Sequence, residues 1–77
     1  MKIDSLITMA NQIGAFFEAE SGEAHPDEAA KLVATHLRRY WEPRMRSEMI
    51  TYFQSNGGEG LDEIVRNGVA LLADGKV

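Results

Sequence analysis

The chain has 77 residues, of which 44% are hydrophobic and 26% charged, and its 12 acidic and 8 basic side chains give a formal net charge of −4. A chain of this length can enclose one small core, so we expect a single domain over residues 1–77. Because cysteine is absent, disulfides, thiolate metal sites, iron–sulfur clusters and cysteine nucleophiles are excluded.

The sequence lacks the signals of an exported or membrane-bound chain. No apolar run approaches the about 20 residues that a transmembrane helix needs. Asp4 and Gln12 interrupt the segment in which a secretory signal would be uniformly apolar. We therefore expect a cytoplasmic protein with no membrane partner. The negative net charge also weighs against nucleic-acid binding, which usually needs a basic domain.

Apolar residues recur at helical spacing in four segments, and no stretch alternates as a strand does. The predicted fold class is therefore all-α, a small bundle of about four helices. We predict helices near residues 4–19, 26–41, 43–55 and 60–73, followed by a frayed tail at 73–77.

Prolines and glycines mark the predicted helix ends. Pro26 and Pro43 suit first turns, because a proline has no amide proton to donate there and its φ is already helical. Gly22 is expected to end the first helix within a loop at residues 20–25, and the segment NGGEG to form the turn before the last helix. The predicted core consists of Met9, Ile13, Phe16, Leu32, Val33, Leu37, Met49, Phe53, Ile64 and Val65.

Two glycines lie inside predicted helices, where each costs on the order of 1 kcal/mol relative to alanine. Gly68 lies in the apolar stripe of the last helix, so we expect another helix of the domain to cross closely there. Gly14 shares a side of the first helix with Ile7 and Asn11, away from the apolar stripe. We predict that these three residues form a contact surface outside the core, for another subunit or for a homodimer. The alternative is that Gly14 is a tolerated small residue with no partner.

Residues 38–46 form a basic island in this acidic chain, with four arginines against one glutamate. Arginine presents planar, bidentate donors that suit carboxylate or phosphate groups. The island spans the bend expected at Pro43, and we predict that it contacts a partner. The alternative is that the arginines pair with the chain's own acids and cap its helix ends. The predicted contact residues are Arg38, Arg39, Tyr40, Trp41, Arg44 and Arg46.

No catalytic, cofactor-binding or metal-binding residue is predicted. His25 lies in an acidic loop and His36 on an apolar stripe, so the two histidines do not make a paired site. His25 with Asp27 and Glu28 would bind a metal only weakly. The NGGEG segment lacks the preceding strand and the following lysine of a phosphate-binding loop. The sequence therefore predicts binding and not catalysis.

Three strings give the chain a resemblance to a known family. They are MANQIGAFF in the first helix, HLRRYWEPRMR across the bend and GEGLDEIV at the start of the last helix. Together they resemble the small delta subunit of soluble, NAD-dependent, molybdenum-containing formate dehydrogenases, and the match spans most of the chain.

The resemblance implies a non-catalytic accessory subunit that holds no cofactor of its own. In that family formate is oxidised at a pterin-bound metal in the alpha subunit, and electrons leave through iron–sulfur clusters and flavin in other subunits. The expected partner is the alpha subunit, and the expected role is to support assembly, cofactor loading or stability of the complex. The alternative is a helical nucleic-acid-binding or regulatory module that uses the basic island.

Overall fold

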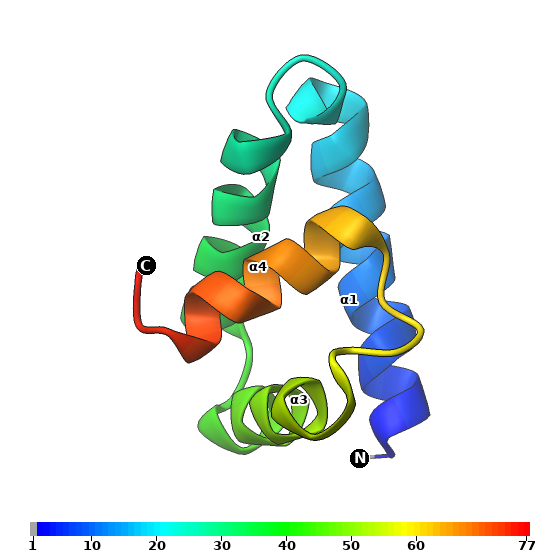
Figure 1. Cartoon of the computed structure of the whole chain (residues 1–77), viewed down its shortest axis with the longest axis vertical. Helices are drawn as coiled ribbons and strands as arrows, with labels where there is room; N and C mark the ends of the chain where they lie inside the picture. The colour runs from blue at the N-terminus through cyan, green and yellow to red at the C-terminus, as the bar shows by residue number, and fades with distance from the viewer. Residues whose placement is uncertain (1) are drawn as a thin grey trace.

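A computed structural model describes residues 2–77 and confirms the all-α prediction, since no strand occurs within that range. The four helices are α1 (Ile3–Phe17), α2 (Pro26–Tyr40), α3 (Pro43–Asn56) and α4 (Glu63–Ala73). α1 and α2 run antiparallel, α4 crosses over both of them, and α3 closes the end at which the N-terminus lies (Figure 1). Within residues 2–77, no helix has both the length and the apolar character that crossing a membrane requires.

The bend between α2 and α3 forms as the sequence predicts. Pro26 and Pro43 each occupy the first position of their helix. Trp41 and Glu42 are extended, with ψ of 142° and 149°, because a residue before a proline is disfavoured in helical geometry. The two extended residues turn α3 away from the axis of α2.

Two helix boundaries differ from the prediction. The first helix does not end near residue 19 but continues as a π-helical turn, Glu18–Gly22, which ends at Gly22 and leaves only residues 23–25 as a loop. Gly22 is buried, and a Cβ at this position would lie 3.0 Å from the Ile64 Cδ1 atom, so its small size serves packing. The last helix begins at Glu63 and not near residue 60, because Gly60 has a φ of 90° that a right-handed helix cannot use.

The C-terminal residues fold back on the molecule. The Lys76 amide donates a hydrogen bond to the Leu71 carbonyl, 3.0 Å away, and Gly75 between them has a φ of 69°. The Arg38 guanidinium donates to the Val77 carbonyl oxygen. These contacts differ from the frayed tail that composition suggested for residues 73–77.

The core lies between α2 and α4, and α1 and α3 cover it from the sides. Its buried apolar members are Leu6, Ala10, Ala29, Val33, Leu37, Trp41, Met49, Leu61, Ile64, Val65 and Val69. Phe16 and Leu32 were predicted to belong to it, but they are 59% and 39% exposed. The prediction fails there because α1 buries a row of small residues with Leu6 and turns its larger rings outward.

Gly68 has the role that the sequence predicts. A Cβ at this position would lie 2.9 Å from the Ala30 carbonyl oxygen and 3.0 Å from the Val33 Cγ1 atom. The absence of a side chain at Gly68 therefore lets α4 cross directly on the backbone of α2, and these two helices share the most extensive contact in the fold.

Candidate functional site

The predicted contact surface on α1 faces the interior. Gly14 is buried, and a Cβ there would overlap the Val65 Cγ2 atom of α4. Asn11 donates from Nδ2 to the Gly60 carbonyl and accepts the Asp62 amide at Oδ1, both at 3.0 Å. The prediction that Ile7, Asn11 and Gly14 lie outside the core is therefore wrong, because α4 and the loop before it already occupy this face. In this fold the three residues hold α1 against α4, not against a second protein.

Two arginines of the basic island are used within the chain. The Arg46 Nη1 atom donates to the carbonyl oxygens of Arg38, at 2.8 Å, and Trp41, at 2.7 Å. These carbonyls lie at the C-terminal end of α2, where helix carbonyls lack intrahelical partners. Arg38 in turn donates to the Val77 carbonyl. For Arg38 and Arg46, the alternative of internal capping describes the structure better than partner contact.

The rest of the island divides between the interior and two outer faces. Trp41 is only 6% exposed and belongs to the core, so most of its side chain packs within the chain. Tyr40 is 71% exposed at the end of α2, with exposed Arg39 beside it. Arg44 is exposed in the first turn of α3. The predicted bend surface is therefore reduced to Arg39, Tyr40 and Arg44.

An open groove of about 430 Å³ runs between α1 and α2, and we call it the aromatic groove. It is lined by Met9, Gln12, Ile13, Phe16, Phe17, His36 and Trp41. Leu32 and Tyr40 lie one helical turn before and after His36, so they border the same groove on α2. Its walls are mainly apolar, with Gln12 and His36 as polar members.

Four rings form a continuous row across the aromatic groove. Phe16 and Phe17 meet edge to face with ring centroids 5.2 Å apart, and Phe17 meets His36 at 6.2 Å. His36 stacks on Tyr40 at 4.8 Å, with 45° between the ring planes. Each ring thereby restricts the rotation of its neighbour. The row joins the aromatic groove to the exposed end of the basic island.

Three large apolar side chains are exposed among residues 2–77: Phe16, Leu32 and Tyr40. Phe16 lines the groove, and Leu32 and Tyr40 lie one helical turn from His36, which also lines it. Sequence reasoning missed the groove because it assigned Phe16 and Leu32 to the core. The sequence did contain a signal that part of this stripe is exposed, since the apolar arc of the first helix is wider than one neighbouring helix can cover. The small pair Ala10 and Gly14, four residues apart, could have shown which side of that arc is buried.

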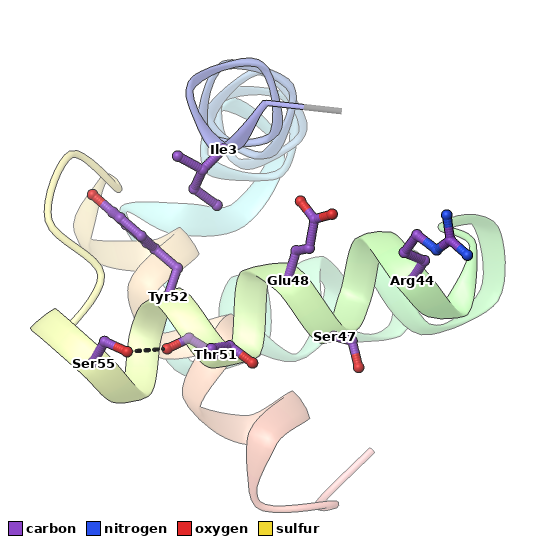
Figure 2. Close-up of a pocket in the computed structure, with 7 residues that line it drawn as sticks. All are labelled: Ile3, Arg44, Ser47, Glu48, Thr51, Tyr52 and Ser55. Atoms are coloured by element: carbon purple, nitrogen blue, oxygen red, sulfur yellow. Dashed lines mark hydrogen bonds between the residues drawn. The ribbon is translucent and has the colours of Figure 1, made fainter.

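A second hollow, of about 480 Å³, lies between the start of α1 and the outer face of α3. Figure 2 shows its lining residues: Ile3, Arg44, Ser47, Glu48, Thr51, Tyr52 and Ser55. Several of its polar groups already have partners in the chain. The Tyr52 hydroxyl donates to the Glu59 carbonyl at 2.7 Å. The Ser55 hydroxyl donates to the Thr51 carbonyl at 2.8 Å (Figure 2).

The two hollows differ in their titratable groups. The aromatic groove has His36 as its one titratable lining residue besides neutral and apolar groups. The second hollow is lined by Arg44, Glu48 and Tyr52. Over residues 2–77, no three His, Asp or Glu side chains are grouped so that they could hold a metal ion. His25 is exposed in its loop.

Comparison with curated proteins and with solved structures gave no match. The model of one protein family, described as the NADH-dependent formate dehydrogenase delta subunit FdsD, matches residues 5–69. The matched range includes α2, α3 and most of α1 and α4, and so both walls of the aromatic groove. The chain therefore belongs to the family of formate dehydrogenase delta subunits.

Proposed function

We propose that this chain is a non-catalytic accessory subunit that binds the alpha subunit of formate dehydrogenase in the cytoplasm. Its role is to support assembly, cofactor loading or stability of the complex. The family match over residues 5–69 carries the proposal, because a delta subunit is one component of a larger enzyme. The exposed aromatic groove supports it, since contiguous exposed apolar surface marks interaction sites in proteins of this size.

The composition of the chain supports the non-catalytic part of the proposal. Without cysteine the chain cannot bind an iron–sulfur cluster through thiolates, so it offers no such path for electrons. Formate oxidation would then belong to the other subunits.

The alternative of a nucleic-acid-binding module loses support from the internal use of the basic island. Phosphate-driven binding generally needs several exposed cations, and each phosphate contact adds to the salt dependence. Arg38 and Arg46 bind backbone carbonyls of this chain. Arg39 and Arg44 are the other two arginines of the island, and they lie exposed on different helices. No observation favours this second function.

The test is co-production of a tagged alpha subunit with and without this chain. We expect the chain to co-purify with the alpha subunit and to resist moderate salt, because the contact buries apolar surface. Omitting the chain distinguishes the three roles. Lower yield of complex indicates assembly, normal yield with less metal and pterin indicates cofactor loading, and normal loading with faster inactivation indicates stability.

Two results would contradict the proposal. If the alpha subunit is made, loaded and active to the same extent without the chain, and the two do not co-purify, the accessory role is wrong. If the purified chain alone reduces NAD with formate, the chain is catalytic. Localisation is tested separately by fractionating cells and detecting the chain and the alpha subunit together in the cytoplasmic fraction.

A further inference from the structure

The aromatic groove is built as a binding surface and not as a weakly packed part of the core. Phe16 and Tyr40 are 59% and 71% exposed, although aromatic rings are the side chains that gain most from burial. Phe16 contacts Phe17 edge to face, and Tyr40 contacts His36 in a tilted arrangement, so each exposed ring already packs on a neighbour within the chain. Anchors that are already ordered lose little conformational entropy on binding, which is a property of interface hot spots.

We infer that the aromatic groove receives an amphipathic helix of the alpha subunit, whose apolar side chains pack on the ring row and whose carboxylate faces Arg39. The inference rests on the proposed function, because it names the surface with which the accessory subunit would bind. It replaces the α1 face that the sequence suggested.

The shape of the groove indicates a helix as its occupant. Its walls are two antiparallel helices that lie side by side (Figure 1). Side chains of such a pair leave a furrow into which the ridges of a third helix can pack. A helix in a groove inserts apolar residues at positions i, i+3 or i+4, and i+7. The row from Phe16 across to Tyr40 offers these residues a continuous apolar floor.

The charge at the border of the groove indicates an acidic flank on that helix. Arg39 follows His36 by three residues and Leu32 by seven, so it lies on the groove side of α2. The guanidinium groups of Arg38 and Arg46 donate hydrogen bonds to backbone carbonyls of this chain, and Arg39 is exposed on the same helix as Arg38. A carboxylate on the partner can therefore take two parallel hydrogen bonds from the Arg39 guanidinium.

A second copy of this chain fits the groove less well. Each copy carries a net charge of −4, so two copies repel each other at long range. In a two-fold contact, each groove would also have to be filled by the surface of an identical groove. A helix that carries its own acidic residues satisfies both the apolar floor and the arginine at the border.

The test measures binding of full-length variants to the purified alpha subunit. Phe16→Glu should weaken binding at least 100-fold, because it places a carboxylate on the apolar floor. Arg39→Glu should weaken it at least tenfold. The matched controls are Thr51→Glu, which adds an acid on the exposed outer face of α3, and Lys31→Glu, which reverses an exposed cation on the α4 side of α2. Both controls should bind within threefold of the unmodified chain, and all four variants should keep its helical signal and melting temperature.

A photo-crosslinking residue at position 16 identifies the occupant. We expect it to label one helical segment of the alpha subunit that carries an acidic residue within one turn of the label. If the unmodified chain binds but Phe16→Glu binds equally well, the groove inference is wrong while the proposed function stands. If the label reaches only a second copy of this chain, a homodimer fills the groove and the inference is also wrong. If the unmodified chain does not bind the alpha subunit at all, the proposed function itself fails.

Discussion

Replacing Gly14 by alanine tests whether this face of α1 is internal. At an exposed position in a helix the change should stabilise the protein by about 1 kcal/mol, because alanine has the higher helix propensity. In the structure the new Cβ would overlap the Cγ2 atom of Val65, which is fully buried. Valine is stiff at χ1 and cannot simply rotate away. Overpacking of this kind costs about 1–3 kcal/mol, which equals or exceeds the gain in helix propensity, so we expect a net loss of up to about 2 kcal/mol.

For a domain of this size, each kcal/mol corresponds to about 4–8 °C in melting temperature, so Gly14→Ala should lower the melting temperature by up to about 16 °C in a thermal melt followed by circular dichroism. The double variant with Val65→Ala should lose less stability than the sum of the two single variants, because the second change opens room for the new methyl group. A higher melting temperature for Gly14→Ala would show that Gly14 faces solvent, and the close contact between α1 and α4 would then be incorrect.

Three further outcomes follow from the contacts described above. Phe16→Ala should change stability by less than about 0.5 kcal/mol in a denaturant titration, whereas Leu37→Ala, at a fully buried position, should cost about 2–5 kcal/mol. Arg46→Ala should cost about 1–2 kcal/mol because it leaves the end of α2 without its cap, and Arg44→Ala should leave the melting temperature unchanged. Asn11→Ala should cost about 1–3 kcal/mol and should speed amide exchange in the loop before α4, which Asn11 holds with both ends of its side-chain amide.

The helices and most of their ends could be predicted from the sequence, because they depend on local backbone preferences. Prolines at the first positions of α2 and α3 and left-handed glycines after α3 fix the ends of these helices through their own backbone preferences. The π-helical turn, Glu18–Gly22, could not be predicted from the sequence. It follows from a tertiary contact, because Gly22 allows Ile64 to pack against that turn.

The buried face of α1 could not be read from apolar spacing alone. Large apolar residues at helical spacing predict a buried stripe, yet the choice between two overlapping stripes depends on the helix that crosses them. The crossing by α4 selects Ala10 and Gly14, because small residues let two backbones approach. The same rule was applied correctly to Gly68. For Gly14, the prediction assigned the close contact to a second protein, although α4 of the same chain makes that contact.

The distribution of side-chain size also explains why the candidate site differs from the predicted one. The inner contacts of α4 use glycine and alanine on α1 and α2, so these helices pack closely with little apolar volume between them. The rings of Phe16 and Tyr40 are then left outside, where they contribute little to the stability of the isolated domain. A domain of this size has a small free energy of unfolding. Large rings that stay exposed do not add to it, and their apolar surface is buried only when a complex forms. Partner binding would thus bury the apolar surface that folding leaves exposed. Among the described residues, that surface lies at the aromatic groove.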